Sequence, residues 1–318
     1  MKEKKHISVL TPCFNEEGNV EALVTAVAQA FEKFPHYTYE HVFIDNCSTD
    51  KTVEILKPIA KENLNVKIIL NSRNFGHIRS PFHGLLQCNG DAVISLVADF
   101  QDPPEMIAKF LQKWEEGYKL VLGIKSRSLE NKWMFATRRY FYNMLTLAAE
   151  GTPPPKNFTG FGLYDKQFID VLRTLDDPYP YFRGMITEFG FDRFELEYTQ
   201  PLRKSGKTKN NFFSLYDMAM LGFVNHSKLP LRIAALMGFF TGICSFFVAL
   251  VYFVYKIIYW QEFTVGMAPL IIGLFFFSSV QLFFIGIIGE YIGAIHTQVR
   301  KRPLVVEKER INFEDTKK

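Results

Sequence analysis

Two long segments in the C-terminal third of the sequence carry no charged side chain. Residues 233–255 and 267–288 contain only apolar, small and uncharged polar residues. Each segment exceeds the roughly 20 residues that a helix needs to cross the hydrocarbon core of a bilayer. We therefore predict two membrane-spanning helices, which leaves the rest of the chain to fold in water.

The basic residues that flank these segments predict their orientation. Lys228 and Arg232 precede the first segment, residues 300–302 are all basic and follow the second, and the connection 256–266 holds one lysine and one glutamate. The positive-inside rule then puts both termini in the cytoplasm. The N-terminus shows no apolar signal core, so we expect a multi-pass protein of the inner (plasma) membrane.

The first hundred residues alternate between short apolar runs and stretches with helical periodicity. The apolar runs lie at 7–11, 41–45, 66–70 and 92–98, and the first helix follows Asn15, which is a good N-cap. Strands that alternate with helices favour right-handed crossovers and a mostly parallel sheet covered on both faces. We therefore predict an α/β domain.

The fourth apolar run ends in a group of polar side chains. Asp99, Gln101 and Asp102 stand before two prolines that cannot continue a strand. Open α/β sheets bind ligands outside the carboxyl ends of their strands, and oxygen donors at that place suit a divalent cation on substrate phosphates. We assign Asp99 and Gln101 to the metal, and Asp102 to the cap of a helix that begins at Glu105.

Several functional classes are excluded by what the sequence lacks. The loop after the first strand has no glycine-rich dinucleotide fingerprint, and the chain has no Walker A sequence, so hydride transfer and P-loop hydrolysis are disfavoured. The net charge is +4 with scattered basic residues, which disfavours nucleic acid as a partner. The four cysteines lack zinc spacing and predict reduced thiols in a cytosolic compartment.

Four ordered motifs resemble those of family 2 glycosyltransferases with the GT-A fold, within them the polyprenyl-phosphate branch. They lie at 12–17, 44–50, 73–76 and 98–105, and the similarity extends over most of the chain. The resemblance implies inverting transfer of one sugar from a nucleotide-sugar to polyprenyl (undecaprenyl) phosphate. UDP-glucose is the first expectation for the donor; UDP-GlcNAc, another UDP-hexose and GDP-mannose follow.

We expect the chain to form a homo-oligomer in the lipid bilayer. We also expect it to be divided into four parts. The parts are a cytoplasmic GT-A catalytic domain at 1–210, an interfacial amphipathic helix at 211–230, a two-helix transmembrane hairpin at 231–296 and a cytoplasmic tail at 297–318.

The resemblance assigns roles to individual residues. The metal, Mg²⁺ or Mn²⁺, would be held by Asp99 and Gln101, which together with Arg203 form the catalytic group. Residues that would bind the nucleotide-sugar are Pro12, Phe14, Glu16, Asp45, Ala98, Asp99, Lys125, Arg203 and Lys209.

The acceptor phosphate would meet Arg127, Arg138 and Arg139. Residues 133–147 mix aromatic residues with the last two arginines and resemble the segment in which relatives hold that phosphate; the same pattern also fits a core helix with solvated arginines. Which of Arg138 and Arg139 points inward stays open. A lipid phosphate, with a second pKa of about 6, is already largely ionised at neutral pH and needs no general base. The basic residues would instead offset the repulsion between two anionic substrates.

The sequence departs from the family pattern at three places. Val97 replaces the first aspartate of the usual Asp-x-Asp, Asn46 and Cys47 replace an aspartate and a glycine, and Lys125 stands where arginine is commoner. Val97 motivates an alternative, a membrane-anchored nucleotide-sugar sensor or scaffold without turnover. A transferase to an acceptor without phosphate and a polysaccharide synthase are further alternatives; the synthase lacks support because the Gln-x-x-Arg-Trp motif is missing.

Overall fold

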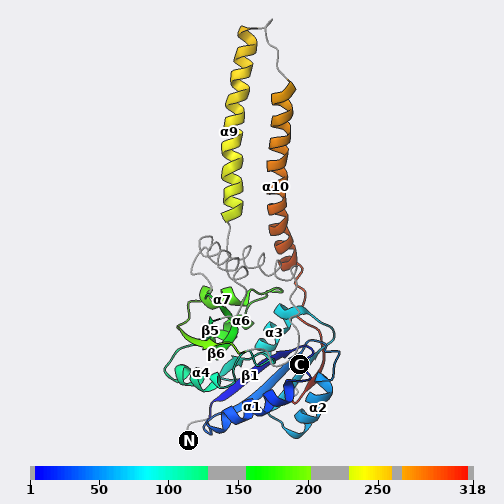
Figure 1. Ribbon diagram of the computed structural model, residues 1–318, viewed down its shortest axis with the longest axis vertical. Helices are drawn as coiled ribbons and strands as arrows, with labels where there is room; N and C mark the ends of the chain where they lie inside the picture. The colour runs from blue at the N-terminus through cyan, green and yellow to red at the C-terminus, as the bar shows by residue number, and fades with distance from the viewer. Residues whose placement is uncertain (1–3, 128–154, 202–228, 260–266, 314–318) are drawn as a thin grey trace.

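The computed structural model describes residues 4–127, 155–201, 229–259 and 267–313. These residues form a globular α/β part and two long helices that project from it (Figure 1). The strands are β1 (His6–Cys13), β2 (Thr38–Asp45), β3 (Val66–Asn71), β4 (Ala92–Ser95), β5 (Leu120–Arg127), β6 (Phe158–Asp165), β7 (Arg193–Thr199) and β8 (Glu307–Ile311). The helices are α1 (Val20–Glu32), α2 (Thr52–Glu62), α3 (Gly76–Gln87), α4 (Met106–Glu115), α6 (Lys166–Arg173), α7 (Phe182–Glu188), α9 (Leu229–Ile258) and α10 (Met267–Val299).

The described strands form one eight-stranded sheet in the order β7-β5-β6-β4-β1-β2-β3-β8. Its centre, β4-β1-β2-β3, is parallel, as the alternation of strands and helices predicted. β6 runs antiparallel between β4 and β5, and β8 runs antiparallel to β3. The sheet is therefore mixed but mostly parallel at its core.

Neighbouring residues of the central strands face two separate apolar clusters. Val9 and Phe43 belong to the cluster that α1, α2 and α4 cover. Leu10 and Ile44 belong to the cluster that contains residues of α3, α6 and α7. Because successive side chains of a strand point to opposite faces, nearly unbroken apolar runs are what a sheet covered on both faces requires.

Two boundaries differ from the sequence-based expectations. β4 ends at Ser95, so Asp99 lies in a turn beyond the strand. The first helix begins at Val20 after Asn19, which makes Asn15 wrong as its N-cap. At the C-terminal end, residues 300–306 lead from α10 to the outer edge of β3, where β8 begins at Glu307.

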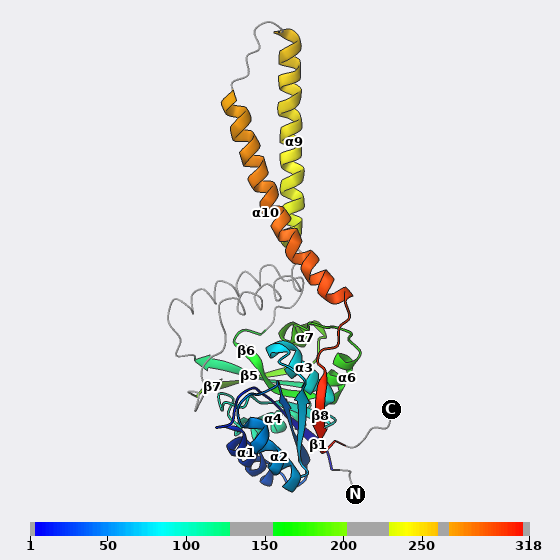
Figure 2. The same cartoon turned by 90° about the vertical axis from the view of Figure 1, so that its right-hand side faces the viewer.

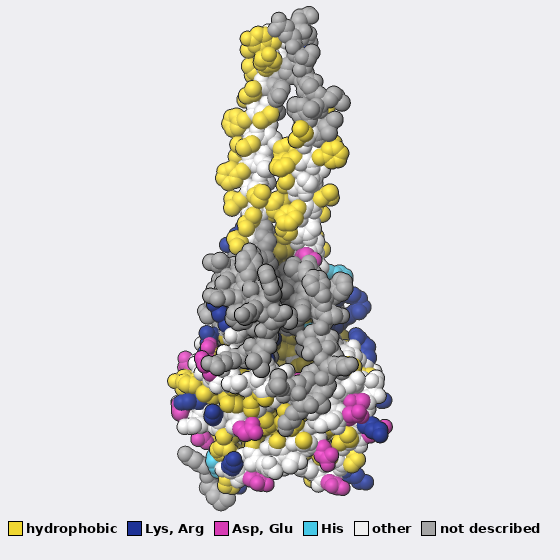
Figure 3. Space-filling view, in the orientation of Figure 1, with side chains coloured by type: hydrophobic (Ala, Val, Ile, Leu, Met, Phe, Trp, Pro, Cys, Tyr) yellow, Lys and Arg dark blue, Asp and Glu magenta, His cyan; other side chains and the backbone are white. Residues whose placement is uncertain are grey.

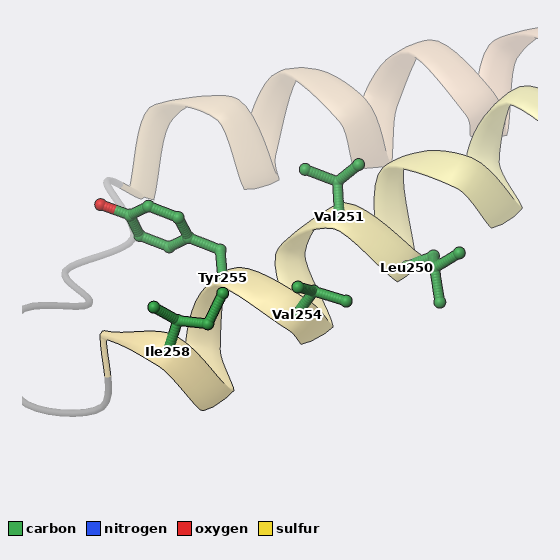
Figure 4. A pocket seen from close by; sticks show the side chains of 5 residues that line it. All are labelled: Leu250, Val251, Val254, Tyr255 and Ile258. Atoms are coloured by element: carbon green, nitrogen blue, oxygen red, sulfur yellow. The ribbon is translucent and has the colours of Figure 1, made fainter.

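The two long helices expose apolar side chains along most of their length. Within the described chain, 231–258 and 272–299 are long and apolar enough to cross a membrane, judged by length and composition. Figure 3 shows apolar side chains covering the projecting helices, whereas charged side chains are spread over the globular part. A shallow apolar groove on α9 is lined by Leu250, Val251, Val254, Tyr255 and Ile258 (Figure 4). Such surfaces are suited to lipid tails.

The chain after α10 is attached to the globular part at several points. Gln298 donates a hydrogen bond to Asp177 (2.9 Å), just before the end of α10. The Ser72 amide donates to the Val306 carbonyl (2.9 Å), and β8 continues this pairing along β3. In Figure 2 the segment after α10 descends along the globular part to β8. The last strand of the chain therefore protects an edge of the sheet that would otherwise be open.

Candidate functional site

Three central strands end in residues with left-handed backbone conformation. Asn15 (φ 58°) follows β1, Cys47 (φ 65°) follows β2 and Phe100 (φ 60°) follows β4. These strands are parallel neighbours, so the three loops lie at one edge of the sheet. Such conformations are uncommon for residues other than glycine and concentrate at functional sites. The edge predicted from the sequence is therefore also the place where the backbone is strained.

Side chains join the loops after β1 and β2. The Asn15 amide donates to the Ser48 hydroxyl (2.8 Å), and the Asn15 side-chain oxygen accepts from the Thr49 amide (2.7 Å). The Glu16 amide donates to the Thr52 hydroxyl (2.8 Å). Asn15 thus connects two loops instead of capping a helix, because its side chain turns toward the neighbouring strand end.

Asp45 ends β2 as a buried carboxylate with 2% exposure. It accepts hydrogen bonds from the Ser48 amide (2.9 Å) and from the Ser48 hydroxyl. Burial raises the pKa of Asp45, while the bonds from Ser48 oppose this shift. Of the other residues expected at the nucleotide, Pro12 pairs with Ile44 in the sheet, and Phe14 and Glu16 are half-buried in the adjoining loop.

Asn46 organises the loop between β3 and α3. Its side-chain oxygen accepts from the Phe75 amide (2.9 Å) and from the Asn71 side chain (3.2 Å). Its side-chain nitrogen donates to the Asn74 side chain (3.0 Å) and to the Gly76 carbonyl (3.2 Å). An aspartate could not donate these last two bonds. The departure from the family pattern at Asn46 therefore has a structural role that the sequence did not reveal.

Arg73 lies in the same loop and received no role from the sequence. Its guanidinium lies 4.0 Å from the centre of the Phe75 ring and donates to the Asn74 carbonyl (3.0 Å). The side chain is exposed at the edge where the strands end. It is a cation that could meet an anionic or aromatic part of a ligand. The only indication in the sequence was its place within one of the four motifs.

The segment after β4 carries two buried carboxylates with different partners. Asp99 is 5% exposed and accepts from the Gln101 amide (3.0 Å). Asp102 is 3% exposed and accepts from the Tyr198 hydroxyl (2.9 Å) and from the Val97 amide. Burial raises the pKa of Asp102 to about 6 against the opposing effect of these bonds. α4 begins at Met106 without a side-chain cap, so the expectation that Asp102 caps it is wrong.

The donor set around Asp99 is small. Ala98 is buried and Val97 is 37% exposed, so the first family carboxylate has no replacement at its own position. Among the described residues no group of three or more histidine, cysteine or acidic side chains could enclose a metal. The carboxylate of Asp99 and the side-chain oxygen of Gln101 would suit a magnesium or manganese ion that takes its other ligands from a diphosphate and water.

Lys125 lies within β5. It pairs with Tyr198 across β5 and β7. The positive charge of Lys125 acts on the carboxyl of Asp102 and lowers its pKa, although burial has the larger, opposite effect. Lys125 therefore belongs to the same end of the sheet as the two buried carboxylates.

The remaining predicted site residues are not described by the structure in full. Arg127 is the last residue of β5, and its side chain is not described. Arg138, Arg139, Arg203 and Lys209 lie outside the described residues.

Two family profiles match the chain. That of glycosyl transferase family 2 matches residues 8–173, and that of the GtrB C-terminal hairpin matches residues 229–295. The first match contains all three strand ends described above. The second contains α9 and most of α10.

Curated relatives align with the chain over nearly its whole length. The bactoprenol glucosyl transferase of Shigella phage SfX is 30% identical, covering 96% of this chain and 99% of that protein. The putative glycosyltransferase CsbB of Bacillus subtilis is 31% identical, covering 95% of this chain and 91% of that protein. The uncharacterized glycosyltransferase YkcC of the same organism is 30% identical, covering 98% and 96%.

Proposed function

The chain belongs to glycosyl transferase family 2 and is a glycosyltransferase, and on this premise we propose that it transfers one hexose from a UDP-sugar to polyprenyl phosphate. The product would be a polyprenyl-phosphate sugar with inverted configuration, used in modification of a cell-envelope glycan. The observation that carries this proposal is a sheet edge with buried Asp45 and Asp99 in a chain that also has two helices long enough to span a bilayer.

The donor would bind across the ends of β1, β2 and β4. Asp45 is held by Ser48 at the end of β2, and Pro12, Phe14 and Glu16 belong to the neighbouring strand end and its loop. Arg73 adds a cation at the same edge. UDP-glucose remains the first candidate, because the Shigella phage relative is named a glucosyl transferase.

Asp99 and Gln101 would hold a divalent cation, Mg²⁺ or Mn²⁺, beside the diphosphate. When bound, such an ion stabilises the negative charge of the departing diphosphate. Lys125 would add positive charge from β5, and Arg203 and Lys209 are proposed to do so from a basic segment that precedes α9.

The acceptor would be a lipid whose phosphate lies at the membrane surface. The name of the Shigella phage relative supports bactoprenol, and α9 and α10 support attachment to a bilayer. An ionised phosphate can attack the anomeric carbon directly, with Arg127, Arg138 and Arg139 as its proposed partners. We further propose that residues 1–210 and both termini lie on the cytoplasmic side of the plasma membrane.

Incubation of the purified full-length protein with labelled UDP-sugars, GDP-mannose, undecaprenyl phosphate and Mg²⁺ tests the proposal. We expect a lipid-linked monosaccharide from one donor. Polymer would identify a polysaccharide synthase. Nucleotide-sugar binding without turnover would favour the sensor that Val97 motivates.

Asp99→Ala gives the sharpest single test of the metal role. We expect a loss of transfer of at least about 100-fold, since a group that holds the ion at the developing charge is removed. Asp170→Ala is the matched control, because Asp170 is a half-exposed carboxylate of α6 paired with Arg173. Normal transfer by Asp99→Ala, at any Mg²⁺ concentration, would refute the assignment.

A further inference from the structure

Arg79 of α3 carries a positive charge that no described acid neutralises. Its Nε atom is buried and has no hydrogen-bond partner among the described residues. Its guanidinium lies 5.3 Å from the centre of the Tyr179 ring. The side chain as a whole is half-buried, but a buried polar atom without a partner requires an explanation such as a missing ligand. For an arginine, that ligand is an anion.

The carboxylates of the segment that carries Tyr179 are already engaged. Asp176 pairs with Lys301 (2.9 Å). Asp177 accepts from the Tyr179 amide (2.9 Å) and from the Gln298 side chain (2.9 Å) through the same oxygen. Both acids therefore serve the attachment of α10 and its following segment, and neither forms an ion pair with Arg79 in the part of the chain that the structure describes.

These contacts also place Arg79 relative to the membrane. Gln298 belongs to the last turn of α10, at the end of the candidate span 272–299. A short series of contacts leads from it through Asp177 and Tyr179 to Arg79. In Figures 1 and 2, α3 and α7 lie on the side of the globular part that faces α9 and α10. If α10 spans the bilayer, Arg79 lies near the level of lipid phosphates.

A second arginine adds positive charge on this side of α3. Arg183 follows Phe182, whose ring packs 6.3 Å from that of Phe82, one turn along α3 from Arg79. The charge of Arg183 also reaches the first turn of α3, where it adds to burial in lowering the pKa of His77. Arg183 therefore adds a second positive charge near the first turn of α3.

We propose that Arg79 binds the phosphate group of a lipid at the membrane surface. The phosphate belongs either to the polyprenyl acceptor or to an anionic phospholipid of the bilayer. Arginine suits both, because its planar guanidinium can donate two parallel hydrogen bonds to phosphate oxygens. The proposal rests on the membrane attachment and, for the acceptor, on the reaction proposed above.

Two measurements on the full-length protein separate these sources. The first is transfer kinetics in phosphatidylcholine nanodiscs, with the KM for undecaprenyl phosphate and for the UDP-sugar determined separately. The second is the affinity of the detergent-solubilised protein for undecaprenyl-free vesicles of phosphatidylcholine with and without phosphatidylglycerol. The variants are Arg79→Ala, Arg79→Gln and Arg79→Lys. The control is Arg193→Ala, which removes an arginine of β7 that is paired with Glu195.

If Arg79 binds the acceptor, Arg79→Ala and Arg79→Gln raise the KM for undecaprenyl phosphate about tenfold. The KM for the UDP-sugar stays unchanged in both variants. Arg79→Lys, which retains a positive charge, raises the KM for undecaprenyl phosphate less. If a phospholipid is bound, both variants instead lose the preference for phosphatidylglycerol vesicles. Arg79→Gln removes the charge but keeps a polar, shorter side chain, so a folding defect limited to Arg79→Ala does not affect the test.

The proposal is overturned if Arg79→Gln matches the wild type in both measurements. A wild-type protein that makes no lipid-linked sugar from any donor refutes the proposed function alone. The vesicle measurement then still decides whether Arg79 binds lipid phosphate.

Discussion

Single residues at the strand ends adopt conformations that their side chains do not favour. Cys47 has a φ of 65° at a position where the family usually has glycine. A residue with a Cβ atom pays about 1 kcal/mol for this conformation, which glycine adopts freely. The strain is local, so its removal is a test at the scale of one residue.

We predict that Cys47→Gly raises the free energy of unfolding by up to about 1 kcal/mol. Thermal unfolding of the detergent-solubilised protein measures this change, and Cys47→Ala serves as the control because alanine retains the Cβ atom. A Cys47→Gly variant no more stable than Cys47→Ala would show that the Cβ atom carries no such strain, and a Cys47→Ala variant less stable than the wild type would show that the thiol makes a stabilising contact.

Tyr198 and Asp102 form a second interaction whose effect can be isolated. The hydroxyl of Tyr198 is a hydrogen-bond donor to a carboxylate with 3% exposure. We predict that Tyr198→Phe destabilises the protein by about 1–3 kcal/mol, because Asp102 loses a partner while it stays buried. Transfer activity should also fall, since the loop that Asp102 holds contains Asp99 and Gln101.

Urea unfolding and transfer kinetics of Tyr198→Phe check this prediction. Tyr118→Phe is a suitable control, because Tyr118 is half-buried against Phe194 at the start of β5 and away from the carboxylates. Equal stability of Tyr198→Phe and the wild type would mean that Asp102 is satisfied without the hydroxyl.

At the scale of elements, β8 is fastened to α3 as well as to β3. Glu307 accepts from His83 of α3 and from Arg310 within β8. Burial disfavours the charged carboxylate, but the bonds from His83 and Arg310 outweigh burial and lower the pKa of Glu307 from 4.5 to about 2. A carboxylate whose pKa is lower in the folded than in the unfolded state stabilises the fold at pH values above the unfolded-state pKa. This contribution is lost as the pH falls toward the folded-state pKa.

We predict that Glu307→Gln destabilises the protein by about 2 kcal/mol at pH 7. The difference from the wild type should shrink as the pH falls from about 5 through the folded-state pKa of about 2, below which both side chains are uncharged. Urea unfolding at a series of pH values measures it. Glu309→Gln is the control on the same strand: its pair with Lys57 is exposed and should matter little. A difference that is constant with pH would refute the role of the Glu307 charge.

At the scale of the whole molecule, the proposed orientation places the two ends of the helical hairpin on opposite sides of a membrane. Tyr259 follows α9 at the far end from the globular part, and Lys308 lies in β8. In a cysteine-free background, we predict that Tyr259→Cys in intact cells reacts with a membrane-impermeant maleimide. Lys308→Cys should react only after the membrane is opened. The reverse pattern would invert the topology, and labelling of both would exclude a spanning hairpin.

Much of the globular fold could be predicted because its determinants are local. The apolar runs at 7–11, 41–45 and 92–98 alternate with helical periodicity, and strand-helix alternation leaves few topologies besides a parallel sheet. The polar residues at these strand ends could be placed at one edge for the same reason. The antiparallel position of β6 between β4 and β5 has no such local pattern, because it depends on pairing between distant segments.

The sequence by itself determined the two apolar helices, the α/β class and the edge that carries Asp45 and Asp99, since periodicity and composition act over short distances. Only the tertiary structure decided the partners: Asn15 binds Ser48 and Thr49, and Asp102 binds Tyr198, 96 residues away. It also decided that Arg79 has none among the described residues. Hydrogen-bond partners are chosen by the packing of elements that meet only in the folded chain, and no local pattern contains that information.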